Sequence, residues 1–309
     1  MKRIRFHAMG SQITVLLESS AEQAQAWLEA VPGWFEEWEQ IFSRFRESSE
    51  LSRLNNAGGA STPVSEPFWQ VLQQARLAWQ SSSGLVSPIL LAPLQAAGYN
   101  RSFDEINPEE PTITIPYVYR LASLDEIQFN PFKRAVSLPP GTGLDFGGVA
   151  KGWAAWQAAT RLTSVGPALV NAGGDIAINS ALPGGQLWPV GIDAPFTQNE
   201  SLGLMMLAKC GVATSGRDRR RWQQNGRWQH HILDPRTGLP AQTDVISATI
   251  IAPDTMQAEA AAKTTLILGS QAGMRWLKSQ PALAALIVCE DGNNLTTENF
   301  GEFLWKKNE

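Results

Sequence analysis

The chain has 309 residues, of which 43% are hydrophobic and 17% charged, a balance typical of a folded globular protein and not of a disordered one. Its formal net charge of −4 excludes a general basic field for nucleic acid or anionic lipid, so any phosphate site must be local. No run reaches the roughly 18 apolar residues of a membrane span, and no signal peptide or lipobox is seen, so we expect a cytoplasmic protein.

Apolar residues at alternating or helical spacing divide the first half of the chain into short elements. Pro32-Gly33 is expected to interrupt the first helix, which restarts at Trp34. Ser48 or Ser49 is suited to cap a short helical turn that follows. The predicted elements are a strand over 12–18, helices over 21–29, from 34 onward and over 67–81, a surface loop over 100–116 and a hairpin over 127–138.

A glycine-rich run over residues 141–152 opens the second half. Its small residues let another group approach the backbone closely. A helix is predicted from Val149 to about Leu162, and a helix N-terminus beside glycines and Lys151 is a ready anion site. The spacing matches neither the dinucleotide fingerprint nor the phosphate loop, so the run is a weak signal when taken alone.

The remaining segments are mostly strands. A strand over 168–178 is broken at Gly173-Gly174, where we expect a bulge or a close backbone approach. Because strands and helices mix without strict alternation, an α+β fold is favoured over a doubly wound one, and one domain over residues 1–309 is expected. The other predicted elements are strands over 186–192, 202–210, 245–252, 283–289 and 295–305, and a helix over 255–268.

Two of the three histidines stand in the run from His230 to Pro240. Asp234-Pro235 bends the backbone tightly, so these polar side chains should converge. Histidine titrates near neutral pH, and the arginines of residues 217–221 carry forks that fit phosphate. The pattern suggests a phosphoester site, and a solvated hairpin loop explains this run alone equally well. His230 is expected to be a surface neighbour, and the arginines either are solvated or meet an acceptor protein.

Seven short runs, taken in chain order, resemble the ApbE family, the FAD:protein FMN transferases, and the resemblance covers nearly the whole chain. One such run would be weak evidence, but seven runs in the family's order together support the resemblance. They are Met9-Gly10-Ser11, Phe42-Ser43-Arg44-Phe45 with residues 49–55, Leu144-Asp145-Phe146-Gly147-Gly148-Val149-Ala150-Lys151-Gly152, Asn171-Ala172-Gly173-Gly174-Asp175-Ile176, Ala213-Thr214-Ser215-Gly216, His231-Ile232-Leu233-Asp234-Pro235-Arg236-Thr237-Gly238 and the alanine-rich helix at Ala258.

The resemblance implies an α+β, T-fold-like architecture of mixed or antiparallel sheets with flanking helices and an FAD cleft between them. The reaction that it implies attaches FMN from FAD to a Thr or Ser of a target flavoprotein by a phosphoester bond and releases AMP. A hydroxyl that attacks a pyrophosphate needs a base, positioning and charge neutralisation. Magnesium normally bridges the phosphates and offsets the developing charge.

Matching positions transfer the family's roles to individual residues of this chain. His231 is expected to act as the base on the acceptor hydroxyl, and Asp234 to orient its loop. The magnesium ligands match the carbonyl of Gly148, the residue Glu259 and the positions of Ala262 and Lys263. The FAD contacts match Met9, Phe45, Leu85, Val86, Ser87, Asp145, Lys151, Ile232 and Lys263.

The metal-binding helix departs from the family pattern, because Glu259 and Lys263 replace its usual Asp and Thr. A protonated lysine has three donors and no acceptor, so it cannot ligate magnesium. The two residues are i and i+4 on the predicted helix and are able to pair. The ammonium of Lys263 is therefore expected in the metal's place. Smaller departures, each of which loses a polar group, are Phe45, Val86-Ser87 and Trp156.

These departures leave three functions open. The first is an FMN transferase with an altered metal dependence. The second is a non-catalytic FAD-binding protein that stores, senses or delivers flavin. The third is an FAD pyrophosphatase on the same scaffold, in which water replaces the protein hydroxyl.

Overall fold

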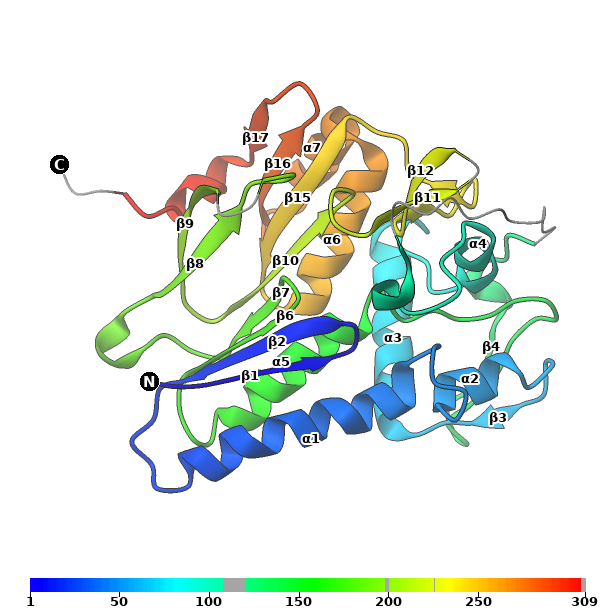
Figure 1. Cartoon of the computed structure of the whole chain (residues 1–309), viewed down its shortest axis with the longest axis horizontal. Coiled ribbons are helices and arrows are strands. Elements are labelled where there is room, and N and C mark those ends of the chain that lie inside the picture. The colour runs from blue at the N-terminus through cyan, green and yellow to red at the C-terminus, as the bar shows by residue number, and fades with distance from the viewer. Residues whose placement is uncertain (108–119, 198–199, 225, 307–309) are drawn as a thin grey trace. The chain divides into compact units, whose positions relative to one another are not determined.

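The computed structural model describes residues 1–107, 120–197, 200–224 and 226–306 (Figure 1). Its contacts group the chain into two compact units. The single domain over residues 1–309 stays a prediction. Unit 1 is Met1–Trp34, Lys151–Arg219 and Thr243–Glu309, and unit 2 is Phe35–Ala150 and Arg220–Gln242.

Unit 1 is built on an eight-stranded sheet in which every neighbouring pair is antiparallel. This pairing agrees with the predicted α+β class and its antiparallel sheets. In spatial order the strands are β1 (Lys2–Ala8), β2 (Ser11–Leu17), β6 (Ala168–Ala172), β7 (Asp175–Ile178), β10 (Cys210–Gly216), β15 (Val245–Ala252), β16 (Ala284–Cys289) and β17 (Asn294–Thr296).

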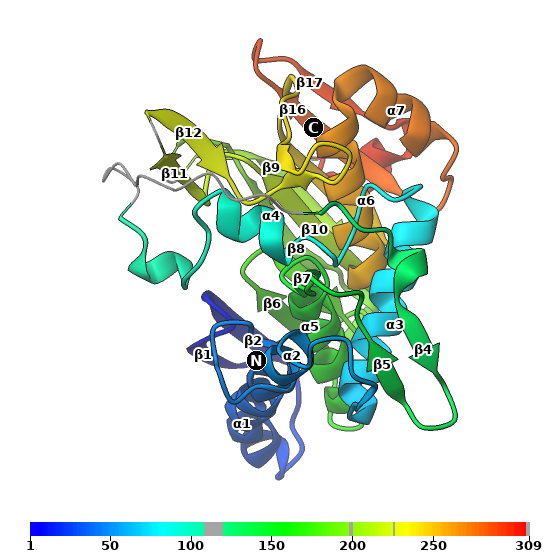
Figure 2. The ribbon, with the colours of Figure 1, turned by 90° about the vertical axis from the view of Figure 1, so that its right-hand side faces the viewer.

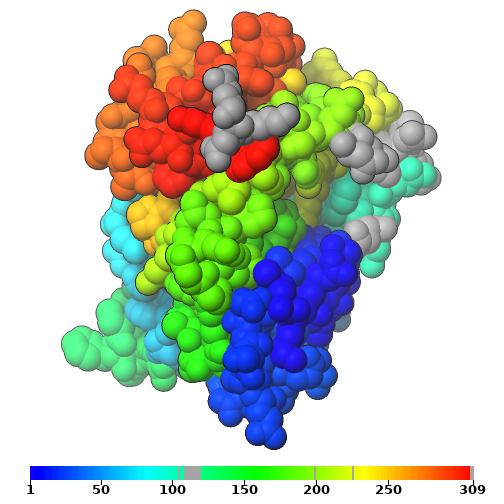
Figure 3. Space-filling model, turned by 90° about the vertical axis from the view of Figure 1, so that its left-hand side faces the viewer, coloured from blue at the N-terminus to red at the C-terminus, as the bar shows by residue number. Residues whose placement is uncertain are grey.

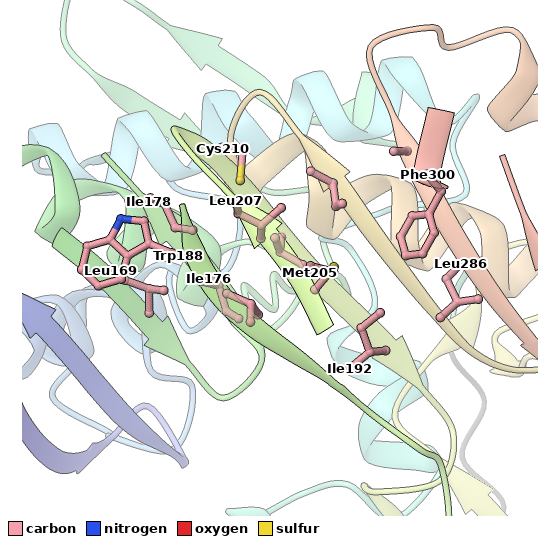
Figure 4. Close-up of a cluster of buried hydrophobic side chains, with 14 residues drawn as sticks. Leu169, Ile176, Ile178, Trp188, Ile192, Met205, Leu207, Cys210, Leu286 and Phe300 are labelled. Atoms are coloured by element: carbon pink, nitrogen blue, oxygen red, sulfur yellow. The ribbon is translucent and has the colours of Figure 1, made fainter. Parts of the chain in front are cut away.

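Alternation along the strands gives this sheet one face of large side chains and one of small ones. Ile176 and Val212 are opposite each other on β7 and β10 and belong to a buried apolar cluster, whereas Ala177 and Gly211 are opposite each other on the reverse face. A two-stranded ribbon, β8 (Trp188–Asp193) and β9 (Ser201–Leu207), contributes Trp188, Val190, Ile192, Met205 and Leu207 to the same cluster (Figure 4). Figure 3 shows this ribbon in light green between the blue N-terminal strands and the red C-terminal residues.

The small-residue face receives helix α6 (Thr255–Leu268), which packs on β7, β10 and β15. The approach is close, because a Cβ on Gly211 would lie only 2.1 Å from the carbonyl carbon of Asp254. Helix α5 (Ala150–Leu162) meets α6 at its first turn, where Thr255 Oγ1 donates to the carbonyl of Gly152 at 2.6 Å. Helix α7 (Ser270–Lys278) and the short 3-10 helices η3 (Pro183–Gly185) and η4 (Glu298–Glu302) complete the unit.

Unit 2 consists of helices and small antiparallel sheets and contains an apolar cluster that includes Tyr99, Trp222 and Leu233. Figure 2 shows its β4–β5 hairpin in green at the lower right. Its helices are α2 (Glu50–Asn55), α3 (Glu66–Ser81), α4 (Leu91–Ala96), η1 (Phe103–Glu105) and η2 (Leu124–Glu126). Its strands are β3 (Thr62–Pro63), β4 (Gln128–Asn130), β5 (Ala135–Ser137), β11 (Arg221–Gln224), β12 (Arg227–His230), β13 (Leu233–Asp234) and β14 (Leu239–Pro240).

Several predicted elements are confirmed nearly to the residue. They include the helices over 67–81, 149–162 and 255–268, the hairpin over 127–138 and the strand over 245–252. Ser49 caps α2, because its Oγ accepts from the backbone N–H of Ser52 at 3.0 Å. The predicted loop over 100–116 contains η1, and its residues 108–116 lie outside the described residues.

The predicted helix break at Pro32 is wrong, because α1 (Ala24–Phe42) runs through it. Leu28, Val31, Phe35 and Trp38 are all buried at helical spacing, so one apolar stripe continues across the proline. Burial of that stripe outweighs the cost of the missing N–H, which is roughly 3 kcal/mol in a helix interior.

Three strand predictions also need correction. Gly173-Gly174 is the turn of a two-residue hairpin between β6 and β7, not a bulge, and both glycines have positive φ (66° and 103°). The alternative prediction of a close approach is confirmed, because a Cβ on Gly173 would lie 2.7 Å from Ser11 Oγ. The single strand over 202–210 is two strands, since the chain turns between β9 and β10. The closing strand over 295–305 is largely η4, and only its first residues belong to β17. Among the described residues, no helix is long and apolar enough to cross a membrane.

Candidate functional site

Four charged side chains meet in unit 1 on the small-residue face of the sheet. Lys263 Nζ lies 2.9 Å from Glu259 Oε1, and Lys151 Nζ lies 3.6 Å from the same oxygen. Lys151 Nζ also lies 3.1 Å from Asp175 Oδ2. We call Lys151, Asp175, Glu259 and Lys263 the charged tetrad. The side chains of Asp175 and Glu259 are only 7% and 2% exposed and those of Lys151 and Lys263 14% and 16%, so the tetrad is not a solvated surface cluster.

The local folding of each element brings these groups together. Asp175 and Ala177 share the face of β7 that receives α6, because side chains alternate along a strand. Lys151 lies in the first turn of α5, next to the contact between Thr255 and Gly152. Glu259 and Lys263 are one turn apart on α6 and therefore share one side of the helix.

Burial and charge act differently on the two carboxyl groups. Burial raises the pKa of Asp175, and the charge of Glu259 adds to this effect against the opposing ammonium groups. Burial acts in the same direction on Glu259, but the ammonium groups of Lys263 and Lys151 outweigh it and hold the pKa of Glu259 below its ordinary value. Glu259 is therefore the carboxylate that stays ionised most firmly.

The tetrad does not fit a magnesium ion. An octahedral site needs several oxygen ligands at about 2.0–2.1 Å, yet an ammonium group already lies against Glu259 Oε1. The other oxygen, Oε2, faces Gly152 so closely that a Cβ there would lie 2.8 Å from it. Among the described residues, no three His, Cys, Asp or Glu side chains are grouped to hold a metal.

Gly152 has a packing role within the glycine-rich run. Besides Glu259 Oε2, a Cβ at this position would lie 3.3 Å from the carbonyl oxygen of Thr255. The absence of a side chain therefore lets α5 and α6 approach each other and places Lys151 beside Glu259. The group that approaches the backbone of Gly152 is thus the carboxylate of Glu259.

Met9 lies in the turn between β1 and β2 and is half-buried. Its φ of 53° is left-handed, a strained conformation for a residue other than glycine, and Gly10 follows with φ 61°. The neighbouring turn approaches closely, because a Cβ on Gly173 would lie 2.7 Å from Ser11 Oγ. Strain of this kind is typical of functional positions, and the predicted flavin contact of Met9 is compatible with it.

In unit 2, Arg44 joins several of the residues that the sequence predicts to bind FAD. Its Nε lies 2.6 Å from Asp145 Oδ2, and its Nη2 donates to the carbonyl of Tyr99 at 2.7 Å. The guanidinium lies over the rings of Phe45 and Tyr99, at 4.2 and 4.6 Å from their centroids. With a side chain only 5% exposed, Arg44 fixes Asp145 next to the 40% exposed ring of Phe45.

Hydrogen bonds at Leu144, Asp145 and Gly147 hold the loop that carries Asp145. Asn55 donates to the carbonyl of Leu144 at 2.9 Å and accepts from its N–H at 2.8 Å. Asp145 Oδ1 accepts from the N–H of Gly147 at 2.8 Å, and the N–H of Asp145 donates to the carbonyl of Pro88 at 2.8 Å. This last bond brings Asp145 to the predicted pocket residues Leu85, Val86 and Ser87, of which Leu85 and Val86 are buried.

The histidine loop of unit 2 is organised by Asp234. Its carboxylate accepts from the backbone N–H of Arg236 at 2.9 Å and from its guanidinium at 2.6 Å, and its carbonyl accepts from Gly238 at 2.8 Å. Burial acts to raise the pKa of Asp234, but the hydrogen bonds from Arg236 outweigh it and lower that pKa. The loop is therefore an ordered turn, in which Ile232 is buried and His231 is half-buried.

The prediction that His230 is a surface neighbour is wrong. The residue is only 9% exposed, and its Nε2 lies 3.0 Å from the carbonyl oxygen of Ala241. Because a carbonyl oxygen only accepts, Nε2 carries the proton in this contact. His230 thus anchors the segment that presents His231.

The predicted site residues fall into two groups. The structure brings together Lys151, Glu259 and Lys263 in unit 1, where Ala262 is fully buried on α6. Met9 lies in the turn between β1 and β2 of the same unit. In unit 2 the structure brings Phe45 and Asp145 together through Arg44, and Ile232 with Asp234 in the histidine loop. Gly148, in unit 2, is half-buried, and its proposed metal contact stays a prediction.

Asp175 and Arg44 were absent from the predicted site. Asp175 had a usable signal, since an acidic residue directly after a Gly-Gly turn heads an otherwise apolar strand. Arg44 stands between two aromatic residues, Phe42 and Phe45, where a buried guanidinium is a natural partner for a ring.

The comparisons with known proteins agree on one family. Residues 9–287 match the model of the ApbE family. The chain is 29% identical over 301 residues to an FAD:protein FMN transferase of Treponema pallidum (strain Nichols), covering 91% of this chain and 82% of that protein. It is 26% identical over 302 residues to an FAD:protein FMN transferase of Haemophilus influenzae, covering 94% and 84%.

Solved structures of ApbE proteins confirm the predicted fold class. The ApbE protein of Thermotoga maritima MSB8 has a TM-score of 0.88 at 24% sequence identity, with 99% of each chain covered. The flavin transferase ApbE from Vibrio cholerae has a TM-score of 0.81 at 21% identity, with 98% of this chain and 99% of that chain covered.

Proposed function

This chain belongs to the ApbE family, and we propose that it transfers FMN from FAD to a threonine or serine hydroxyl of an acceptor flavoprotein and releases AMP. The observation that carries the proposal is the extent of the match, which spans 91% of this chain and 82% of an FAD:protein FMN transferase. A match of that length includes both the histidine loop and the helix that carries Glu259.

The reaction breaks the phosphoanhydride bond of FAD and forms a phosphoester bond to the acceptor. The acceptor oxygen forms a bond to the phosphorus of the FMN half of FAD, the pyrophosphate bond to that phosphorus breaks, and AMP leaves with the bridging oxygen. His231 is proposed to receive the proton of the attacking hydroxyl, for which an imidazole that titrates near neutral pH is suited. Asp234 holds the turn that presents His231 through its bonds to Arg236 and Gly238.

Each unit offers its own candidate contacts for the substrate FAD. In unit 2, the exposed ring of Phe45 offers a stacking surface, and the guanidinium of Arg44 packs against this ring and orients it. Leu85, Val86, Ser87 and Ile232 are proposed to line the nucleotide pocket beside Asp145. In unit 1, Met9 is proposed to contact a ring of FAD, and the ammonium groups of Lys151 and Lys263 to offset the charge of the pyrophosphate.

A magnesium ion in this family is expected to neutralise phosphate charge as a Lewis acid. Gly148, Glu259 and Ala262 are the positions that match the family's ligands, but the ammonium of Lys263 lies against the only one of them with a carboxylate. The residues of this chain therefore fit the substrate better than they fit the metal, and no step above depends on a metal.

The altered pair of Glu259 and Lys263 supports a second proposal, a non-catalytic FAD-binding protein that stores, senses or delivers flavin. One ammonium on a flexible stem offsets less charge than a divalent ion in fixed geometry. Binding of FAD would then persist while the transition state lost its stabilisation.

Product analysis separates these functions. The purified chain is incubated with FAD and with an apo-flavoprotein that carries an acceptor threonine, and the products are resolved by chromatography and by flavin fluorescence on a denaturing gel. Covalent flavin with an equal amount of AMP supports the transferase. AMP with free FMN identifies a pyrophosphatase, and bound but unchanged FAD identifies the non-catalytic protein.

A further inference from the structure

We propose that the ammonium group of Lys263 permanently takes the place of a divalent cation in this chain, so that the charged tetrad works without a metal ion. The inference concerns the charge requirement of the same site and so rests on the proposed function. The binding of a cation can nevertheless be measured without any transfer reaction, so the two proposals can fail separately.

Both oxygens of Glu259 are enclosed by the protein. Oε1 lies 2.9 Å from Lys263 Nζ and 3.6 Å from Lys151 Nζ. Oε2 faces the backbone of α5 at Gly152, where there is no room even for a Cβ. A metal ion would have to displace an ammonium group from Oε1 or separate α5 from α6 at Oε2.

The balance of formal charge within the charged tetrad also opposes a metal ion. With all four groups ionised, the formal charges of two carboxylates and two ammonium groups cancel within the tetrad. A divalent ion would add two uncompensated positive charges to groups that are 2–16% exposed. Uncompensated charge is costly at buried positions, so the tetrad as it stands opposes cation binding.

The contact between Glu259 and Lys263 differs from an ordinary helical ion pair in its burial. Exposed pairs at this spacing are common and contribute little. Glu259 is 2% exposed and Lys263 16%, so their contact lies within the packed face between α6 and the sheet. An ammonium group has three donors and is able to contact a carboxylate and a phosphate oxygen at once. Lys263 is thus placed to offer a cation that cannot dissociate.

The test uses Mn²⁺ as the probe, because its binding to the full chain can be followed by electron paramagnetic resonance and calorimetry without FAD. Wild type is compared with Lys263→Thr and with Lys278→Thr. The second variant is a matched control, since it removes the charge of an exposed lysine from the neighbouring helix α7. A further variant, Lys263→Asn, supplies an amide oxygen should the threonine variant fail to fold.

The expected result is no saturable binding of Mn²⁺ by wild type or by Lys278→Thr, and an affinity at least about tenfold higher in a folded variant of Lys263. Saturable binding by wild type, at an affinity equal to that of the Lys263 variants, overturns the proposal. The proposal is also overturned if Lys263→Thr and Lys263→Asn both fold and neither binds Mn²⁺ more tightly than wild type. If wild type transfers FMN only when a metal is added, this proposal fails and the proposed function stands.

Discussion

Lys263 and Glu259 lie one turn apart on α6, and their side chains meet at 2.9 Å inside the packed face of unit 1. Lys151 lies between that carboxylate and the one on β7, at 3.6 Å from Glu259 and 3.1 Å from Asp175. Two helices and a strand thus converge on a cluster in which positive and negative groups are equal in number.

His231→Ala tests the proposed base. General-base catalysis by a positioned side chain contributes about 10²- to 10⁴-fold, so the rate of covalent flavin transfer should fall by about that factor. The dissociation constant for FAD should change little, because the imidazole acts on the acceptor hydroxyl. The rate is measured from covalent flavin fluorescence, and the affinity by titration with FAD.

His230→Ala is the companion to that variant. Because His230 is buried and contacts the carbonyl of Ala241, its loss should lower the free energy of unfolding by about 1–3 kcal/mol, as expected when a buried acceptor loses its donor. If His231→Ala transferred FMN at the full rate while a folded His230→Ala lost transfer, the roles assigned to the two histidines would be reversed.

Arg44→Met tests the buried contact that holds Asp145. Removal of one partner of a buried ion pair leaves the other without its counter-charge, and here the ring contacts with Phe45 and Tyr99 are also lost. We expect the free energy of unfolding to fall by about 3 kcal/mol, measured by chemical denaturation. Arg46→Met is the control, because its pair with Glu36 is exposed and should contribute no more than about 1 kcal/mol. Equal losses in the two variants would contradict a special role for Arg44.

Asp234→Asn tests the anchor of the histidine loop through its dependence on pH. The hydrogen bonds of Arg236 hold the pKa of Asp234 below its ordinary value of about 3.9, so the carboxylate stabilises the fold above that pH. The contribution is lost as the pH falls through the folded pKa. Wild type should therefore exceed the variant by at most about 1 kcal/mol at pH 7, and the difference should narrow steadily below about pH 4. A difference that widens in acid would contradict the assignment.

Met9→Gly tests whether backbone strain is maintained for a binding role. Relief of the left-handed φ of 53° should raise the free energy of unfolding by up to about 1 kcal/mol, while the loss of the side chain weakens FAD binding. Ser83→Gly is a control, because Ser83 has φ 52° and is exposed. It should gain stability with no change in FAD affinity. An unchanged FAD affinity in Met9→Gly would remove Met9 from the binding site.

Elements with strong local signals could be predicted from the sequence, whereas edge elements could not. Helix α6 has a central run of strong helix formers and an Asp254 cap, and its predicted range is correct. Strand β1 was missed because its Arg and His residues alternate on an edge strand with only one strand neighbour. Helix α7 was missed as well, since it follows α6 after a single glycine and has little apolar character.

The candidate site was predictable where residues interact within one element. The pair of Glu259 and Lys263 followed from helical spacing alone, and the turn at Asp234 from its Asp-Pro sequence. The contacts of Lys151 with Asp175 and of Arg44 with Asp145 join segments distant in the chain. They depend on how β7, α5 and α6 pack and on how two loops of unit 2 meet, and no local pattern specifies that packing.

In the proposed site, the ammonium group of Lys263 replaces a metal ion at the substrate phosphates. The most direct measurement is a titration of wild type with FAD, followed by flavin fluorescence, in magnesium and again in EDTA. We predict dissociation constants that agree within about twofold, and a magnesium dependence of about tenfold in Lys263→Thr combined with Glu259→Asp. Binding of FAD by wild type only when magnesium is present would contradict the claim.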